Sequence, residues 1–250
     1  MKQFVLTPVM GKRLIGKAMA VHPAVASAMK KGTLVIVAGT TNGYVAEEVL
    51  AATNQSAGFT RKGFRRGMVL SPSFDAGSLK AEFPGDVVLT NGQWQKGKEI
   101  FDVVDTMQAG DVILKGANAL DLATGQAAVL IGHPMGGTIG AAISALIGRR
   151  VTLIAPVGLE KRICGDLWEL ARELNAPSAE GPRLMPLPGE VFTELDAIAL
   201  LTGASAKLVA AGGICGAEGA VWIAITGQEG QLKAAADLIK SVANEPPCVA

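Results

Sequence analysis

Residues 33–50 read TLVIVAGTTNGYVAEEVL, in which a continuous apolar run leads through a short turn into a helical pattern. The run 33–38 is typical of a buried strand, and Val45, Val49 and Leu50 recur at the spacing of one helix face. We therefore predict a strand, a tight turn, and a helix that begins at residue 42 or 43.

The turn between this strand and this helix is predicted to bind a small anion. Small residues let the backbone approach a ligand, and the first amides of a helix have no partners inside the helix. A plain helix cap made by Thr41 or Asn42 is the alternative, since either side chain can satisfy a helix start. The predicted element consists of Gly39, Thr40, Thr41, Asn42 and Gly43.

The same alternation of strand and helix continues along the chain and predicts an α/β fold. Helical patterns occupy 12–30, with a bend at Pro23, and later 138–147 and 159–174. Between them stand the short apolar runs MVLS, DVVLT, DVILKG, AAVLIG and VTLIAPVG. Uninterrupted apolar strands suit a mostly parallel sheet with helices on both faces, which is a three-layer arrangement.

A change of composition near residue 175 predicts a second, smaller domain. The segment NAPSAEGPRLMPLPGE holds four prolines and is interpreted as a linker or an ordered edge. Beyond it we expect a helix over 191–201, strands over 206–211 and 220–226, and a last helix. This order is that of a small α+β unit of ferredoxin-like type. The predicted domains are an α/β domain over 1–175 and the α+β domain over 176–250.

Composition limits the kinds of partner. Of the 250 residues, 49% are hydrophobic and 18% are charged, so the chain can bury a sizeable core. The formal net charge is +1, which argues against binding to nucleic acid or to an anionic membrane through a global basic field. Three cysteines, Cys164, Cys215 and Cys248, form no C-x-x-C pair and no even set. With no clear signal-peptide pattern at the N-terminus, we expect a cytoplasmic protein.

A stretch of 27 residues between Asp121 and Arg149 carries no charge, which raises the alternative of a membrane span. Its middle reads GHPMGG, which is typical of a turn rather than of a helix centre. We therefore predict a buried strand over 127–131, a loop, and a buried helix over 138–147.

Two further strand ends carry polar residues that could face a ligand. In VILKGANALD, Lys115 follows an apolar strand, and Asn118 and Asp121 extend a polar rim. The alternative is a surface loop in which Asp121 caps a helix. The candidate binding residues of this strand end are Lys115, Gly116, Ala117 and Asn118, and Lys115 and Asp121 are also candidate catalytic residues.

The third strand end, LIGHPMGGTIGAA, holds one of the two histidines of the chain. Paired glycines before a helix again predict a cradle of backbone amides. His133 is a candidate general acid or base near neutral pH, although a structural role is the alternative. The candidate residues of this loop are Gly132, His133, Gly136, Gly137 and Thr138.

Several weaker candidates remain. The loop TRKGFRRG concentrates Arg61, Lys62, Arg65 and Arg66, which suits a phosphate or a CoA diphosphate unless the loop is simply solvated. Glu160 is a candidate nucleophile or base, or an acid at a helix start. Two distant histidines and unpaired cysteines give no usual metal spacing, so neither a metal nor a cofactor is expected. No GxGxxG string follows the first strand, which argues against a dinucleotide fold.

The three strand ends, in this order, resemble the superfamily of ribose-5-phosphate isomerase, glucosamine-6-phosphate deaminase and CoA transferases. VIVAGTTNGYVAEEV is similar to the isomerase's first strand, turn and helix, KGANALD to its aspartate-rich motif, and GHPMGGTIGA to its glycine-rich segment. The similarity spans about 32–158. It implies a sugar phosphate or a similar anion held at the first turn.

The chain also departs from that family. Lys115 and Asn118 stand where the resemblance implies the isomerase's two proton-transferring aspartates, and only Asp121 persists. Proton transfer between adjacent carbons needs a positioned base, so ordinary isomerase activity is not expected. Neither Glu160 nor Glu218 lies in the setting of a CoA-transferase nucleophile.

Two hypotheses follow. In the first, an isomerase- or transferase-like enzyme acts on a small phosphorylated or acyl substrate through Lys115, Asp121 or His133. In the second, the same pocket binds such an anion without turnover, as a sensor or regulatory module. A nucleotide- or flavin-binding protein is a more distant third. In each case we expect a homo-oligomer that binds a small anionic ligand and neither nucleic acid nor membrane.

Overall fold

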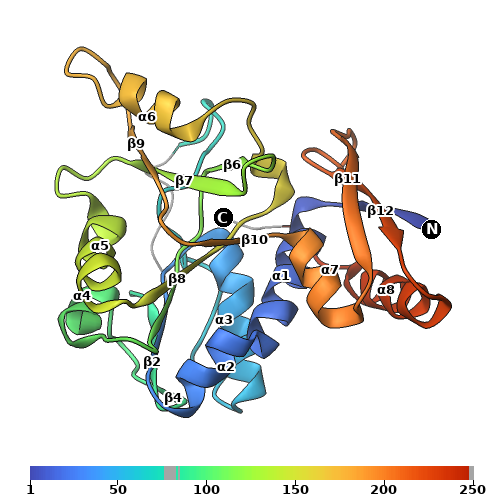
Figure 1. Cartoon of the computed structure of the whole chain (residues 1–250), viewed down its shortest axis with the longest axis horizontal. Coiled ribbons are helices and arrows are strands. Elements are labelled where there is room, and N and C mark those ends of the chain that lie inside the picture. Colours follow the sequence, from blue (N-terminus) through green and yellow to red (C-terminus); the bar gives the residue numbers. More distant parts are fainter. Residues whose placement is uncertain (76–82, 84, 248–250) are drawn as a thin grey trace.

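The computed structural model describes residues 1–75, 83 and 85–247, and it is a mixed α/β fold. The described chain forms three sheets, one of six strands and two of three strands (Figure 1). The predicted α/β class is thus confirmed, while the sheet that forms the centre is mixed rather than mostly parallel.

The six-stranded sheet has the order β10-β8-β5-β2-β3-β4. Its first four strands pair in parallel and its last three pair antiparallel, so that β2 is where the direction changes. The strands are β2 (Thr33–Ile36), β3 (Val87–Thr90), β4 (Gln93–Trp94), β5 (Val112–Leu114), β8 (Thr152–Pro156) and β10 (Glu190–Phe192). In register, Ile36 lies opposite Leu114, which lies opposite Ile154, so these three strands end side by side.

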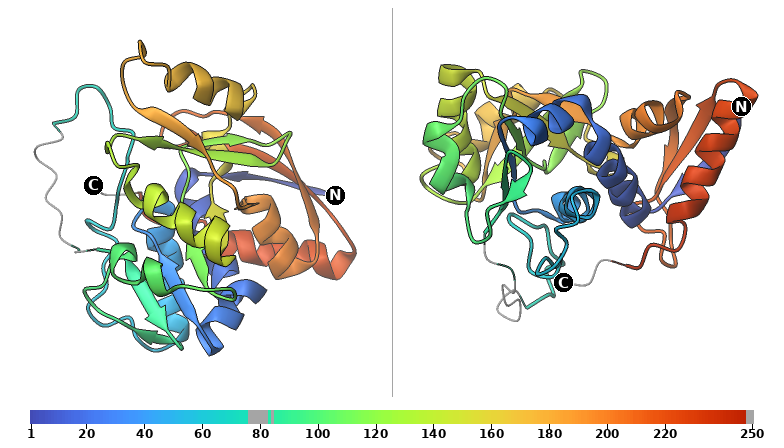
Figure 2. Two further views of the ribbon diagram at one scale, coloured as in Figure 1. Left: turned by 60° about the vertical axis from the view of Figure 1, so that its left-hand side comes forward. Right: turned by 90° about the horizontal axis from the view of Figure 1, so that it is seen from below.

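Helices lie on both sides of this sheet, with α1, α2 and α3 on one side and α4 and α5 on the other (Figures 1 and 2). The bounds are α1 (Pro8–Val21), α2 (Pro23–Lys30), α3 (Thr40–Ala52), α4 (Ile100–Val103), η2 (Val104–Thr106) and α5 (Gly137–Arg149). The predicted helix over 12–30 is two helices, because Pro23 has no amide to continue the first and instead opens the second. The helix predicted after the turn that follows β2 is confirmed. It begins at Thr40, directly after Gly39, and not at residue 42 or 43 as predicted.

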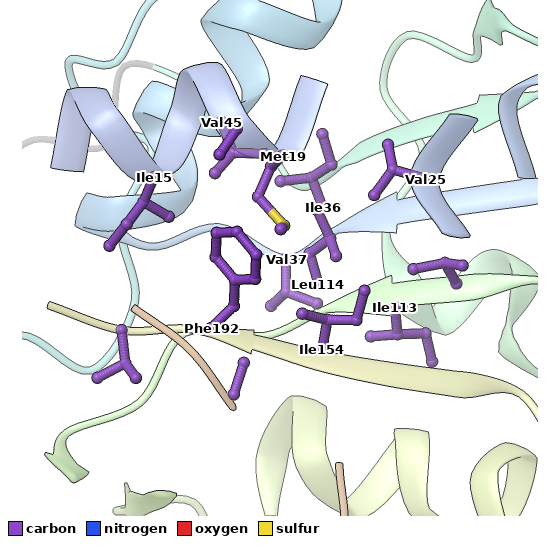
Figure 3. Packing of buried hydrophobic residues seen from close by; sticks show 14 of the residues in the cluster. Ile15, Met19, Val25, Ile36, Val37, Val45, Ile113, Leu114, Ile154 and Phe192 are labelled. Carbon is purple, nitrogen blue, oxygen red and sulfur yellow. The ribbon is translucent and has the colours of Figure 1, made fainter. Parts of the chain in front are cut away.

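The core lies between this sheet and helices α1 to α3. Figure 3 shows Ile15 and Met19 of α1 over Ile36 of β2 and Ile154 of β8, with Phe192 of β10 beside them. All five side chains are buried. Each buried aliphatic side chain of this size stabilises the fold by roughly 1.5–3 kcal/mol. This packing fixes the strand ends on which the site is built.

A second sheet, β1-β12-β11, brings the beginning and the end of the described chain together. β1 (Lys2–Leu6) pairs antiparallel with β12 (Val221–Thr226), which pairs antiparallel with β11 (Ser205–Ala211). Helices α7 (Glu194–Thr202) and α8 (Glu229–Val242) pack against these strands. The predicted order of helix, strand, strand and helix is confirmed, and β1 joins the same sheet from the other end of the described chain.

The third sheet, β6-β7-β9, is antiparallel and stands apart from the six-stranded one. It consists of β6 (Ala119–Asp121), β7 (Gln126–Ile131) and β9 (Arg183–Pro186), and α6 (Leu167–Leu174) packs on it. Strand pairing therefore runs across residue 175, because β9 joins β7 and β10 joins β8.

Two local predictions were wrong. The run MVLS at 68–71 forms no strand, and the predicted helix over 159–174 is a short turn η3 (Leu159–Lys161) followed, after a gap, by α6. Of the two interpretations of the proline-rich segment 175–190, the ordered edge is confirmed, because it holds the edge strand β9. The uncharged stretch before Arg149 divides into β7, a loop and α5, as expected. No helix in the described part of the chain is long and apolar enough to cross a membrane.

Candidate functional site

A cavity of about 720 Å³ opens at the carboxyl ends of β2, β5 and β8. Its walls come from the turn after β2, the loop 60–70, the turn after β5, residues 160 and 161 after β8, and residues 246 and 247. Ligands of α/β sheets gather at such strand ends. Among the described residues that line it, five are cationic (Arg61, Arg65, Arg66, Lys115 and Lys161) and two are acidic (Glu47 and Glu160).

The turn after β2 contributes Gly39, Thr40 and Thr41 to the cavity. Thr41 is 2% exposed, and its hydroxyl makes no hydrogen bond with any residue that the structure describes. A buried hydroxyl without a partner costs free energy, so an oxygen-rich ligand at this point would relieve a real penalty. The turn also stands at the start of the 13-residue helix α3, where the backbone amides favour an anion.

The other two residues of the predicted turn have structural roles. Asn42 is fully buried, and its amide nitrogen donates to the carbonyl oxygens of Val37 (2.8 Å) and Leu114 (2.9 Å). It thereby ties the ends of β2 and β5 together instead of facing the cavity. A Cβ on Gly43 would lie 3.2 Å from Cγ of Arg61, so this glycine leaves room for that side chain.

Lys115 stands at the end of β5, where its backbone amide donates to the carbonyl oxygen of Ile154 at 3.0 Å. Its ammonium group forms no hydrogen bond or ion pair with the described residues. Burial lowers the pKa of Lys115 to about 8, against the opposing charge of Asp86, and the charges of Arg66 and Lys161 lower it further. At neutral pH the side chain is therefore a poorly solvated cation without a carboxylate in contact.

Asp86 is buried beside this lysine and was not among the residues predicted from the sequence. Its Oδ1 accepts a hydrogen bond from the amide of Ala38 (2.8 Å) and its Oδ2 from the amide of Ile100 (2.9 Å). Arg66 lies 3.4 Å from Oδ1 and also 3.3 Å from Glu99. Burial raises the pKa of Asp86, and the two amides and Arg66 oppose that rise. Thr41, Arg66, Asp86 and Lys115 are called the Lys115 corner below.

After the neighbouring strand β8, two lysines have partners in the fold. Nζ of Lys12 lies 3.0 Å from Oε1 of Glu160, and Nζ of Lys161 donates to the carbonyl oxygen of Ala117 at 2.6 Å. Burial lowers the pKa of Lys161 as well. Oε2 of Glu160 is buried without a partner among the described residues. Lys12, Glu160, Lys161 and Glu194 are called the Glu160 corner.

Glu194 lies behind this pair and is fully buried at the start of α7. Burial raises its pKa to about 8, and the charge of Glu160 adds to the rise. Its Oε2 accepts from the amide of Leu159 at 2.9 Å. A Cβ on Gly11 would clash with its Oε1, so this glycine leaves room for the carboxyl group. At neutral pH this residue is a neutral acid that holds η3 in place.

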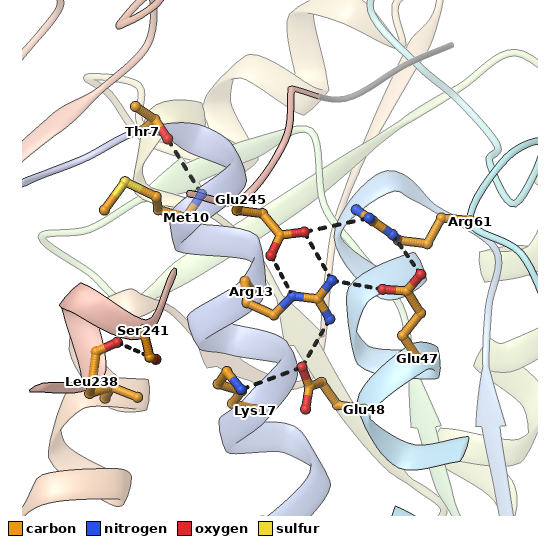
Figure 4. Close-up of polar contacts among 10 residues, drawn as sticks. All are labelled: Thr7, Met10, Arg13, Lys17, Glu47, Glu48, Arg61, Leu238, Ser241 and Glu245. Carbon is orange, nitrogen blue, oxygen red and sulfur yellow. Dashed lines mark hydrogen bonds and ion pairs between the residues drawn. The ribbon is translucent and has the colours of Figure 1, made fainter. Parts of the chain in front are cut away.

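The basic loop is anchored rather than simply solvated. Arg61 contacts Glu47 at 2.8 Å and Glu245 at 3.4 Å, and its guanidinium lies 4.0 Å from the centre of the Tyr44 ring. Figure 4 shows that Arg13 of α1 binds the same two carboxylates, at 2.7 Å and 2.9 Å. This network fixes the loop and the residues before Pro246 as walls of the cavity, and it occupies the charge of Arg61.

The third predicted strand end does not line the cavity among the described residues. β7 belongs to the separate three-stranded sheet, so its loop points elsewhere. His133 is exposed, and its Nδ1 accepts from the amide of Met135 at 3.1 Å, while Arg183 donates to the carbonyl oxygen of Gly132 at 2.9 Å. The expectation that three loops share one pocket is corrected accordingly. Gly136, Gly137 and Thr138 open α5 away from the cavity.

The second strand end is divided between the cavity and the fold. Gly116, Ala117 and Asn118 line the cavity with Lys115. Asn118 also donates to the carbonyl oxygen of Gly67 (3.0 Å) and accepts from the amide of Leu130 (3.0 Å), which holds the basic loop to β7. Asp121 lies outside the cavity, where its carboxylate accepts from the amide of Ala123 and the hydroxyl of Thr124. It stabilises a turn, not a helix start.

Two signals would have found some of the missed residues. Asp86 and Asp111 both follow a glycine and precede a strand, and both accept two backbone amides. That Gly-Asp pattern was visible in the sequence. Glu194 carries no such signal, because an acid at a helix start usually faces solvent. No cluster of three or more metal-ligating side chains occurs in the part of the chain that the structure describes. Cys164 and Cys215 are free and exposed, and Cys248 lies outside the described residues.

No family model, curated protein or solved structure matches the chain. The geometry of the cavity is therefore the basis on which function is argued, and the resemblance to the isomerase superfamily stays a prediction.

Proposed function

We propose that the cavity binds a small anionic metabolite, of the sugar-phosphate or acyl-CoA type, between the start of α3 and Lys115. The observation that carries the proposal is Lys115, a partly buried cation that lines the cavity at a strand end and contacts no carboxylate among the described residues. Burying a charge without a partner is costly, and a ligand with negative charge would offset that cost. The unpartnered hydroxyl of Thr41 supports the same position for the anion.

The arginines of the basic loop contribute less to the binding of this anion than their number would suggest. Arg61 and Arg66 are already paired with carboxylates, so they shape the wall and set its potential. Lys161 has one donor engaged with Ala117, and an ammonium group has three. Lys115 and Lys161 are therefore the two side chains on which we place the ligand's charge.

The test is the shift of the unfolding midpoint caused by sugar phosphates, CoA esters, nucleotides and inorganic phosphate. A ligand that binds the folded state stabilises it by about 2.7 kcal/mol at 100 times its Kd. Thr41→Val keeps the shape and removes the unpartnered hydroxyl, so the ligand-free variant should be at least as stable as the wild type. We expect this variant to lose part of the ligand-induced shift.

His133→Ala is the matched control, because His133 lies outside the cavity. It should show the full ligand-induced shift. An anion that shifts Thr41→Val as much as the wild type would contradict the assignment of the α3 turn, and a chain that responds to no anion would contradict the proposed function.

Turnover separates the two forms of the proposal. An isomerase- or transferase-like enzyme would convert the bound anion, and Lys115→Arg would keep binding while losing product. A sensor or regulatory module would bind the same anion and yield no product with either protein. Asp121→Asn should leave both measurements unchanged, since Asp121 lies outside the cavity.

The remaining sequence-based expectations go with this proposal. We propose that the helices on both sides of the central sheet form the three-layer scaffold of the superfamily that the sequence resembles, and that β1, β11, β12, α7 and α8 act as its small α+β unit. A cytoplasmic homo-oligomer that binds neither nucleic acid nor membrane is part of the same proposal.

A further inference from the structure

Two partly buried lysines line the same cavity after the neighbouring strands β5 and β8, and only one of them has a hydrogen-bond partner among the described residues. Lys161 donates to the carbonyl oxygen of Ala117 at 2.6 Å, which fixes the position of its nitrogen. Lys115 has no such contact with the described residues. Lys115 is only partly buried and lines the cavity, so its ammonium group is open to the cavity instead of being held by an acceptor of the fold. Lys115 is thus the amine that is left available to a ligand.

The surroundings of Lys115 favour its neutral, nucleophilic form. Burial and the nearby charges of Arg66 and Lys161 lower its pKa to about 8, while Asp86 opposes them only in part, because its oxygens already bind two amides and Arg66. At pH 7 an amine with this pKa is neutral in about one molecule in ten, against about one in 2,500 for an ordinary lysine. Lysines activated in this way, by burial and a second cation, react with carbonyl compounds.

The cavity offers room and charge for such a compound. Its volume of about 720 Å³ lies within the range of sites for small metabolites. The start of α3 and Lys161 can hold an anionic group while a carbonyl carbon meets Nζ of Lys115. Lys161, which can bind the anion, also contributes to the lowered pKa of Lys115, after burial and together with Arg66.

We propose that Lys115 forms an imine with the carbonyl group of an anionic substrate, which is a small oxo acid or a phosphorylated aldehyde or ketone. The amine lone pair forms a C–N bond as the carbonyl π bond breaks, and the resulting alcohol then leaves as water with the protons of the nitrogen. No oxidant or reductant takes part. The inference rests on the proposed function, since the anionic group positions the carbonyl, and it names the class of ligand.

The test traps the imine by reduction with borohydride. Pyruvate, glyceraldehyde 3-phosphate and pyridoxal 5′-phosphate serve as anionic carbonyl probes, and pyridoxal, which lacks the phosphate, is the matched uncharged probe. Peptide mass spectrometry then locates the adduct. We expect modification of Lys115 at least tenfold faster than of the exposed Lys30 and Lys240, with a half-maximal rate near pH 8. Pyridoxal should react at Lys115 more slowly than pyridoxal 5′-phosphate does. Inorganic phosphate should slow the reaction of pyridoxal 5′-phosphate with Lys115.

Two variants give the control. Lys115→Arg keeps the positive charge and cannot form an imine, so we expect it to lose the adduct and to keep the phosphate-induced shift of the unfolding midpoint. Lys240→Arg, at an exposed lysine outside the cavity, should keep the adduct. Circular dichroism checks that both variants fold. The position of the adduct in the wild type is found by mass spectrometry and does not depend on the folding of any variant.

The outcomes distinguish the two proposals. Binding of phosphate without preferential reaction at Lys115, or with equal reaction at Lys161, would overturn the imine and leave the anion site standing. Preferential reaction at Lys115 that is indifferent to phosphate would overturn the role of the anion in positioning the carbonyl. Neither binding nor preferential reaction would overturn both.

Discussion

The Lys115 corner and the Glu160 corner follow neighbouring strands of one sheet, and their charged groups differ in the partners they have. In the Glu160 corner, Lys12 meets a carboxylate at 3.0 Å, Lys161 meets a carbonyl oxygen, and Glu194 is neutral at pH 7. In the Lys115 corner, the carboxylate of Asp86 is engaged by two amides and Arg66, and the ammonium group of Lys115 forms no hydrogen bond or ion pair with the described residues.

This difference separates charges that serve the fold from a charge that serves a ligand. Paired or neutralised groups cost little once buried, so the Glu160 corner can hold η3 and α7 against α1. An unpaired buried ammonium costs stability in the free protein. Such a cost is common at functional sites, where stability and function trade against each other. Substitutions in the two corners should therefore change stability in different directions.

The largest expected effect is the pH dependence carried by Glu194. Its pKa rises from an ordinary value of 4.5 to about 8 in the folded protein, so the folded state holds a proton that the unfolded state releases. The group's contribution is fully present below pH 4.5, falls as the pH rises, and is lost above pH 8. Because each tenfold difference in proton affinity between the two states is worth about 1.4 kcal/mol, the loss is roughly 5 kcal/mol.

Glu194→Gln should abolish this loss. We expect the variant to equal the wild type near pH 5 and to exceed it in free energy of unfolding at pH 8.5, measured by urea denaturation at both values. Glu229→Gln is the matched control, because Glu229 is also the first residue of a helix but is exposed. If both substitutions gave the same pH profile, Glu194 would not be the buried acid described.

Breaking the ion pair of the Glu160 corner should have the next largest effect. Glu160→Gln leaves Lys12, which is 8% exposed, without its counter-charge, so we expect the free energy of unfolding to fall by about 3 kcal/mol. Chemical denaturation at pH 7 measures the change. Glu169→Gln breaks an exposed pair with Arg172 and should cost less than about 0.5 kcal/mol. Equal costs for the two substitutions would show that the Glu160 corner is not paired as described.

The two lysines should respond to the same substitution with opposite signs. Lys115→Met removes a buried charge without a contact, so we expect a ligand-free protein that is more stable by roughly 1–3 kcal/mol at pH 7 and that has lost its response to phosphate. Lys161→Met leaves the carbonyl of Ala117 without its donor and should cost about 1–3 kcal/mol. Thermal unfolding with and without phosphate measures both. A loss of stability in Lys115→Met would contradict the comparison.

The smallest effect is expected outside both corners. His133→Ala removes an exposed ring whose one contact is local, so the free energy of unfolding should change by less than about 0.5 kcal/mol. The phosphate-induced shift should equal that of the wild type. A clear loss of that shift would indicate that the loop around His133 takes part in binding the anion.

The sequence predicted those elements whose signal is local. Residues 33–50 and the run before Lys115 formed the expected strands, because an apolar run and a helical period depend on neighbours along the chain. The partner of a strand is a long-range property, so the pairing of β7 with β9 in a proline-rich segment was not foreseen. This single pairing takes His133 away from the cavity.

The residues of the candidate site also divide into those with a local signal in the sequence and those whose role depends on long-range packing. Gly39, Thr41 and Lys115 were found because they follow strands that end side by side. Lys161 and Asp86 were missed because their importance depends on burial by segments distant in sequence. The role of Asn42 was predicted as ligand binding and is better described as a tie between two strands, since nothing in the sequence places the carbonyl oxygens of Val37 and Leu114 beside it.

The pairing of β1 with β12 has a consequence for synthesis on the ribosome. Residues 2–6 leave the ribosome before their partners, which are residues 221–225. At translation rates of 5–20 residues per second, β1 waits roughly 10–45 s before its partner strand exists. During that time a nascent chain exposes an unpaired strand edge and the apolar side of α1, which are features that chaperones bind. We expect overproduction at lower temperature or with added chaperones to favour the folded protein over aggregates.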